Sequence, residues 1–149
     1  MIAEGGYGFV YLVTDPKTNI RYAMKKYNIQ GRQDEISIIR ELKIWEDINK
    51  NENIVSLVDH QVEGGKALIL MELCEEGTLL QWINKQTSDI PEKQILYIMI
   101  QISKGISCMH SRKPPIAHRD LKIDNVLKFG TTLKLCDFGS ASEETYDPL

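Results

Sequence analysis

Residues 118–125 read His-Arg-Asp-Leu-Lys-Ile-Asp-Asn, and residues 137–139 read Asp-Phe-Gly. These segments bring carboxylate, amide and lysine side chains into loops at the ends of short predicted strands, with Asp137 standing 17 positions after Asp120. Carboxylate and amide oxygens suit Mg²⁺, which is a hard cation, and lysines suit phosphate groups. Phosphoryl transfer needs metal ligands, phosphate neutralisers and a carboxylate that orients the attacking hydroxyl. The segments therefore indicate such a site, and the alternative is a solvated charged loop.

A glycine-rich stretch lies near the start of the chain, where residues 4–10 read Glu-Gly-Gly-Tyr-Gly-Phe-Val. Three glycines within a predicted hairpin remove side chains where the backbone must approach another group closely. The N–H groups exposed there would suit phosphate oxygens. A flexible turn explains the glycines equally well, so this motif is weak on its own.

Lys25 and Glu41 form a candidate ion pair. Lys25 lies in a predicted strand, and Glu41 lies within the apolar stripe of Ile38, Leu42 and Trp45 on a predicted helix. A buried carboxylate is costly unless it is paired, and Lys25 is a candidate partner. The alternative places Glu41 at the edge of the stripe, where its carboxylate reaches water.

Apolar periodicity and turn residues predict an α+β chain. Strands come first, then a helix, more strands, two helices and short strands, without the regular alternation of α/β folds. The last helix is expected to bury Ile95, Ile98, Ile102, Ile106 and Met109. Strands are predicted at residues 9–13, 20–27, 54–62, 67–73, 116–117, 126–128 and 133–136, and helices at residues 34–49, 78–86 and 91–111.

Composition limits the class of protein. The chain has 149 residues, of which 42% are hydrophobic and 26% charged, and its net charge is −3. This is the composition of one globular domain, and the mild acidity argues against nucleic acid as the main partner. No apolar run reaches membrane-spanning length. Cys74, Cys108 and Cys136 are scattered and odd in number, which favours a reducing intracellular compartment over a disulfide framework or a zinc site.

The chain resembles a eukaryotic protein kinase from residue 2 to residue 142. Five motifs occur in that family's order, namely a glycine-rich loop, a strand lysine, a helix glutamate, the segment 118–125 and the Asp-Phe-Gly segment. Agreement of all five disfavours the charged-loop alternative. Lys122, two residues after Asp120, resembles the serine/threonine class. Within the family the chain is most similar to the Numb-associated kinases, particularly the cyclin-G-associated and adaptor-associated members, through residues 3–11, 71–74, 113–116 and 135–141.

This resemblance implies a bilobal kinase fold that uses ATP and Mg²⁺. An N-lobe of one antiparallel sheet and one helix is expected over residues 1–73. The hinge, the first C-lobe helices, the catalytic loop and the Asp-Phe-Gly segment are expected over residues 74–149. Because no Ala-Pro-Glu motif precedes Leu149, we expect the C-lobe to be truncated after the Asp-Phe-Gly region and this fragment alone to be inactive.

The resemblance also assigns catalytic roles. Asp120 would accept the proton of the substrate hydroxyl, and Lys122 would neutralise the γ-phosphate. Lys25 would hold the α- and β-phosphates while paired with Glu41. The Mg²⁺ ligands would be Asn125 and Asp137.

The implied ATP site has two parts. In the phosphate-covering loop, Gly5 and Gly8 correspond to the second and third glycines of the family, and Ala3 replaces the first. In the adenine site, Met71 would be the gatekeeper. The expected ATP-contacting residues are Ala3, Gly5, Gly6, Gly8, Val10, Ala23, Lys25, Met71, Glu72, Cys74, Leu127 and Cys136.

Individual contacts follow from the same resemblance. The adenine ring would lie between three apolar side chains and would bond to the backbone at two positions. The three are Val10, Ala23 and Leu127, and the backbone positions are Glu72 and Cys74. A stack of side chains, the regulatory spine, would comprise Trp45, Leu57, His118 and Phe138.

Expected partners follow from the family as well. A protein substrate with serine or threonine is implied, with clathrin-adaptor subunits as the subfamily's example. The implied location is cytoplasmic, peripheral to membranes through regions outside this chain. A second hypothesis is a truncated, non-catalytic nucleotide-binding or pseudokinase-like interaction module. The presence of every catalytic side chain favours the enzyme for the parent protein, and the missing C-terminal half favours the module for this polypeptide.

Overall fold

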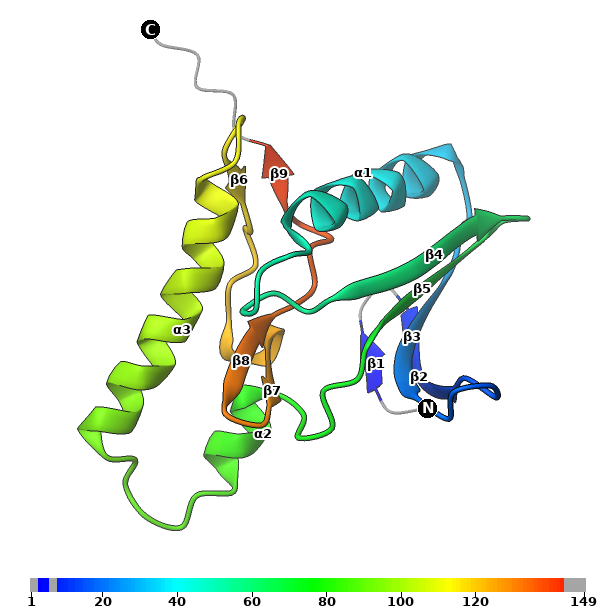
Figure 1. Ribbon diagram of the computed structural model, residues 1–149. Coiled ribbons are helices and arrows are strands. Elements are labelled where there is room, and N and C mark those ends of the chain that lie inside the picture. Colours follow the sequence, from blue (N-terminus) through cyan, green and yellow to red (C-terminus); the bar gives the residue numbers. More distant parts are fainter. Residues whose placement is uncertain (1–2, 6–7, 144–149) are drawn as a thin grey trace, which may run out of the picture.

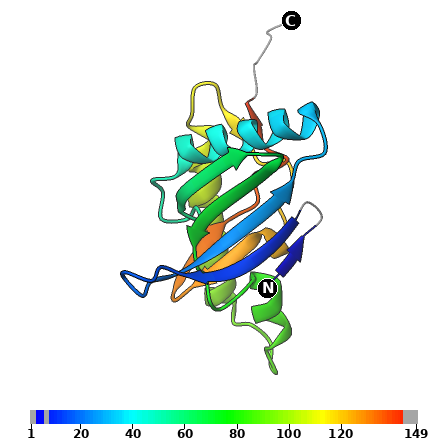
Figure 2. The same ribbon diagram turned by 90° about the vertical axis from the view of Figure 1, so that its right-hand side faces the viewer.

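The computed structural model describes residues 3–5 and 8–143, with side chains from residue 8 onward (Figure 1). The N-terminal half forms one five-stranded antiparallel sheet in the order β1-β2-β3-β5-β4. Helix α1 (Arg32–Ile48) lies against this sheet (Figures 1 and 2). The strands are β1 (Ala3–Gly5), β2 (Gly8–Thr14), β3 (Arg21–Asn28), β4 (Leu57–Glu63) and β5 (Lys66–Glu72).

Between β5 and residue 143, the described chain forms two helices and short paired strands. Helix α2 (Leu79–Asn84) is followed by the long helix α3 (Glu92–His110), which runs beside β8 in Figure 1. Strand β6 (Ile116–Ala117) pairs with β9 (Ser142–Glu143), which was not predicted, and β7 (Val126–Phe129) pairs with β8 (Thr132–Leu135). A single 3₁₀ turn, η1 (Ile123–Asn125), precedes β7. The α+β class is confirmed.

Helix α1 buries the stripe that its sequence predicts. Ile38, Leu42, Trp45 and Ile48 are all buried in the core against the sheet. These residues recur three or four positions apart, so they share one helical face. Glu41 lies within that face and is only 4% exposed, so the alternative in which it reaches water is wrong.

Strand β4 begins at Leu57, three residues later than predicted, because the preceding segment pairs elsewhere. The Val55 N–H donates to the Leu135 carbonyl at 3.0 Å, and the Leu135 N–H donates to the Asn53 carbonyl at 2.8 Å. The β-favouring residues of this segment thus pair with β8, and sequence alone does not specify which strand they pair with. This pairing ties the connection after α1 to the strand that immediately precedes Cys136 and Asp137.

Helix α3 packs four of the five apolar residues of its predicted stripe against the core. Of the five, Ile95 is exposed, at 47%, and the same side of the helix also buries Gln101 and Gly105. A Cβ at Gly105 would lie 2.8 Å from the Leu135 side chain, so glycine permits the close approach of helix and strand. A pattern of apolar residues alone does not identify buried Gln and Gly residues. Among the described residues, no helix is long and apolar enough to cross a membrane.

Candidate active site

Strand β3 lies at the centre of the sheet and carries the candidate lysine. Its register places Lys25 opposite Val10 of β2, and Ala23 opposite Met71 of β5. Because side chains alternate along a strand, Ala23, Lys25 and Tyr27 share one face. Burial of Ala23 and Tyr27 shows that this face points into the protein.

Lys25 lies between two carboxylates from distant parts of the chain. Its Nζ is 3.4 Å from Asp137 Oδ1 and 3.8 Å from Glu41 Oε1. The Lys25 side chain is 12% exposed and Glu41 is 4% exposed, whereas Asp137 is 35% exposed. The predicted pairing of Lys25 with Glu41 is therefore present, and Asp137 joins it.

Burial and charge act against each other in this cluster. Burial disfavours the Lys25 ammonium, but Glu41, Tyr27 and Asp137 together outweigh it and raise the pKa of Lys25. Burial also raises the pKa of Glu41, and the Lys25 charge opposes that shift. Lys25 consequently carries a positive charge at neutral pH, as contact with a phosphate would require.

The segment of residues 118–125 is held by hydrogen bonds to the residue that precedes Asp137. His118 is buried, and its Nε2 lies 3.1 Å from the Cys136 carbonyl. The Asp120 N–H points to His118 Nδ1 at 3.3 Å. The Cys136 N–H donates to the Asn125 carbonyl at 3.0 Å. These bonds hold the loop beside the residue that precedes Asp137.

Asp120 lies at the centre of the loop's polar contacts. Lys122 Nζ is 2.9 Å from Asp120 Oδ2, and Asn125 Nδ2 donates to both Oδ2 and the backbone carbonyl of Asp120, at 2.9 Å each. The hydrogen bond from Lys122 lowers the pKa of Asp120, and the same contact raises the pKa of Lys122. Asp120 is thus an ionised carboxylate that can accept a hydrogen bond from a hydroxyl.

An aromatic stack joins α1, the 118–125 segment and the Asp-Phe-Gly segment. The Phe138 ring is fully buried, and its centroid lies 5.4 Å from those of Trp45 and His118. Trp45 Nε1 donates to the Val55 carbonyl at 2.6 Å. Leu57 is also buried in this core. Three of the four predicted spine residues are therefore in ring contact, and Asp137 is held beside them with a φ of 62°.

The hinge residues already use part of their backbone. The Glu72 N–H donates to the Ser56 carbonyl at 3.0 Å, and the Cys74 carbonyl accepts from the Gly77 N–H at 3.3 Å. A bound base would therefore be left with the Glu72 carbonyl as acceptor and the Cys74 N–H as donor. Leu127 of β7 is the predicted apolar wall of the adenine site. Its backbone pairs with that of Thr78, shortly after the hinge, in an isolated antiparallel β-bridge.

The two thiols of the predicted ATP site are partly buried and neutral. Burial raises the pKa of Cys74 and of Cys136 to about 12 in each case. A protonated thiol is a weak nucleophile, so both residues act as small apolar groups.

Asn125 and Asp137 fit a magnesium ion in their donor chemistry. Asn125 uses its amide nitrogen on Asp120, which leaves its side-chain oxygen for a cation. Within residues 3–5 and 8–143, no cluster of three or more His, Cys, Asp or Glu is arranged to hold a metal. Mg²⁺ commonly takes one or two protein oxygens and completes its shell with phosphate oxygens and water. The pair therefore suits an ion that arrives with a nucleotide.

The glycine-rich loop is described only in part. Gly5 pairs with Gly8 across β1 and β2, and the predicted ATP-contacting Gly6 lies outside the described residues. A Cβ at Gly8 would lie 2.4 Å from the Lys26 carbonyl oxygen, so a larger residue would push β2 away from β3. The close approach of β2 and β3 therefore accounts for glycine at position 8 without any contact to a phosphate.

Two residues beside the site were missed by sequence analysis. Tyr27 donates its hydroxyl to Glu41 Oε2 at 3.2 Å, and Lys134 of β8 lies 2.9 Å from Glu72 Oε1. The two-residue period of β3 places Tyr27 on the face of Lys25, so that signal was available. Lys134 sits between Leu133 and Leu135, where the sequence offers no indication of its partner.

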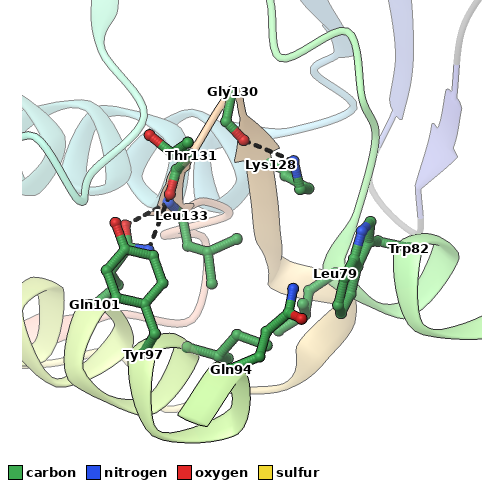
Figure 3. Close-up of a pocket in the computed structure, with 10 residues that line it drawn as sticks. Leu79, Trp82, Gln94, Tyr97, Gln101, Lys128, Gly130, Thr131 and Leu133 are labelled. Carbon is green, nitrogen blue, oxygen red and sulfur yellow. Dashed lines mark hydrogen bonds between the residues drawn. The ribbon is translucent and has the colours of Figure 1, made fainter. Parts of the chain in front are cut away.

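A pocket elsewhere in the molecule is distinct from this cluster. It has a volume of about 170 Å³ and lies between α2, α3 and the β7–β8 hairpin (Figure 3). Trp82 and Tyr97 stand on opposite sides of it, and Gln101 bonds to the Thr131 carbonyl at 3.0 Å on its wall. None of its lining residues belongs to the predicted catalytic or ATP-binding set.

Comparison with known proteins agrees with this geometry. The protein kinase domain model matches residues 1–148, and the chain belongs to that family.

Three relatives define the class further. Two probable serine/threonine-protein kinases of Dictyostelium discoideum are each 38% identical to the chain, over 99% and 96% of it. An actin-regulating kinase, PRK1, of Saccharomyces cerevisiae is 34% identical over 95% of the chain. The chain spans only 20%, 14% and 19% of the lengths of these three proteins, respectively.

Proposed function

We propose that the protein is an ATP- and Mg²⁺-dependent serine/threonine protein kinase, which transfers the γ-phosphoryl group of ATP to a protein hydroxyl. The observation that carries this proposal is the position of the Lys25 ammonium between the carboxylates of Glu41 and Asp137. The loop that holds Asp120 is bonded to the residue before Asp137, so the lysine and the candidate base belong to one site.

Each polar residue has a distinct role in this proposal. Lys25 holds the α- and β-phosphates, and Glu41 holds Lys25. Asp120 accepts the proton of the attacking hydroxyl, and its contact with Lys122 keeps it ionised until then. Lys122 then neutralises charge on the transferred group; its side chain is half-exposed and its ammonium lies beside Asp120.

The nucleotide and metal would be held by the remaining predicted residues. Asn125 and Asp137 supply oxygens to Mg²⁺, which neutralises phosphate charge when bound. The adenine would lie between the walls from β2, β3 and β7 and would bond to the hinge backbone. These contacts involve Ala3, Gly5, Gly6, Gly8, Val10, Ala23, Met71, Glu72, Cys74, Leu127 and Cys136.

We place the boundary between the two kinase lobes after residue 73, where β5 leads into the hinge. The subfamily that we propose is the Numb-associated kinases, supported by residues 3–11, 71–74, 113–116 and 135–141. On that basis we propose clathrin-adaptor subunits as candidate substrates, and a cytoplasmic location, peripheral to membranes.

The test is transfer of radiolabelled γ-phosphate to a generic protein substrate by the full-length protein, with and without Mg²⁺. We expect Mg²⁺-dependent label on serine or threonine, and its loss in Lys25→Met. Equal transfer by Lys25→Met would refute the assignment of Lys25. Binding of ATP without any transfer by the unaltered protein would favour the non-catalytic nucleotide-binding module instead.

A further inference from the structure

Glu41 receives its hydrogen bonds from a side chain that the proposed catalytic set does not include. The Tyr27 hydroxyl lies 3.2 Å from Glu41 Oε2 and 3.4 Å from Oε1. The Lys25 ammonium, in contrast, stands 3.8 Å from Glu41 Oε1, which is longer than a hydrogen bond. Tyr27 and Glu41 are both buried, at 5% and 4% exposure. The phenol is therefore the close donor to this carboxylate.

The charges of the cluster show why such a donor is needed. One ammonium, Lys25, lies between two carboxylates, Glu41 and Asp137. Its nearer contact is Asp137, the more exposed of the two. A buried carboxylate without a close donor is strongly disfavoured. The Tyr27 hydroxyl supplies the close hydrogen bond that Lys25, which is shared with Asp137, does not make to Glu41.

Tyr27 also contacts Lys25 directly. Lys25 Nζ lies 4.8 Å from the centroid of the Tyr27 ring, within the range of a cation–π interaction. The two residues are two positions apart on β3, so the ring and the ammonium lie on the same face of the strand. One side chain thus touches both members of the ion pair.

We propose that Tyr27 is a positioning residue for phosphoryl transfer: it fixes the Glu41 carboxylate through its hydroxyl and confines Lys25 with its ring. This inference rests on the proposed function. Tyr27 keeps the Glu41 carboxylate in place, and that carboxylate in turn holds Lys25 toward a phosphate.

The experiment is a double-mutant cycle in the full-length protein, using Tyr27→Phe, Glu41→Gln and the double variant. Phenylalanine keeps the ring and removes only the hydroxyl. The matched control is Tyr22→Phe, the same change in the same strand on its opposite face. Turnover and KM for ATP are measured per active site, and Mg·ATP affinity is measured by calorimetry.

We expect Tyr27→Phe to lower kcat roughly tenfold, as for loss of a hydrogen bond to a charged group, with KM for ATP changed less than about threefold. Misplacement of Lys25 costs more in the transition state than in the ground state. In the Glu41→Gln background, Tyr27→Phe should lower kcat less than about twofold, because the carboxylate that the Tyr27 hydroxyl contacts is already altered. Tyr22→Phe should match the unaltered protein.

Other outcomes would overturn the inference. Equal effects of Tyr27→Phe in both backgrounds would show a general structural role, and activity equal to the control would show no role. If the unaltered protein binds Mg·ATP but transfers no phosphate, the proposed function fails, and positioning for phosphoryl transfer fails with it. If it does not bind Mg·ATP, both claims fail.

Discussion

The Lys134 ammonium lies 2.9 Å from the Glu72 carboxylate, and their side chains are 9% and 20% exposed. Lys134 belongs to β8, two residues before Cys136, and Glu72 is the last residue of β5. The same carboxylate oxygen accepts the Ser56 N–H at 2.6 Å. This pair therefore fixes the end of β5, where the hinge begins, to the strand that leads into Asp137.

Replacing Lys134 with Met should weaken both the fold and nucleotide binding. The change removes the cation from a largely buried carboxylate, and such a loss typically costs about 1–3 kcal/mol. We expect a lower free energy of unfolding in urea and weaker ATP binding in calorimetry. The control is Lys104→Met, which removes an exposed ammonium 3.9 Å from Glu52 and should be nearly neutral. Equal losses in both variants would contradict a special role for Lys134.

Asp120→Asn and Asp137→Asn should differ in phenotype. Asparagine at 120 keeps the size of the side chain but removes the proton acceptor, so turnover should fall by a factor of about 100 or more while ATP affinity survives. Asparagine at 137 weakens the metal site and the contact with Lys25, so Mg²⁺-dependent affinity should fall as well. Titrations of ATP with and without Mg²⁺ check this division. Equal loss of affinity in both variants would disprove it.

Glu41 should make stability depend on pH. Burial raises its pKa above the ordinary value of 4.5, so between 4.5 and the raised value the folded protein binds a proton that the unfolded chain releases. This contribution is fully present below pH 4.5 and is lost as pH rises through the raised pKa. Relative to Glu41→Gln, the free energy of unfolding of the unaltered protein should therefore fall over that interval.

Urea unfolding from about pH 4 to about pH 8 measures this difference. Glu52→Gln, at an exposed carboxylate, serves as the control and should follow the unaltered protein at every pH. A difference between the unaltered protein and Glu41→Gln that stays constant with pH would show that Glu41 does not titrate in this way.

Sequence was most informative where a local pattern and a chemical need coincided. The stripe of α1 predicted burial for Glu41, and the cost of a buried carboxylate predicted the lysine partner that the structure provides. The order of the motifs then connected Asp120 with Asp137. These inferences depend on periodicity and charge, both of which are properties of short segments.

Sequence was least informative where the choice of partner decides the structure. The pairing of Val55 with Leu135 and the bond between Lys134 and Glu72 join segments that are far apart in the chain. The burial of Gly105 on α3 was missed for a related reason, because this glycine is buried for the space it leaves to Leu135 and not for its hydrophobicity. Contacts between distant segments of this kind can be identified only once the packed structure is known.

Helix α3 carries an apolar patch that should make the 149-residue chain associate. Five of its large apolar side chains are between 47% and 56% exposed. They lie along its first three turns, and contiguous patches of more than a few hundred Å² usually mark a surface that becomes covered. The members of this patch are Ile95, Leu96, Tyr97, Met99 and Ile100.

The paired change Leu96→Glu with Ile100→Lys should disperse the chain, because it places opposite charges four residues apart on the exposed face. Sedimentation velocity at several concentrations should show association of the unaltered 149-residue chain and a monomer for the paired variant, with ATP affinity unchanged. The matched control is Ile36→Glu with Ile39→Lys, two side chains of α1 that are 42% and 51% exposed. Because those residues lie outside the α3 patch, the control should associate like the unaltered chain. A monomeric unaltered chain, or equal dispersal by both paired variants, would show that the α3 patch does not drive association.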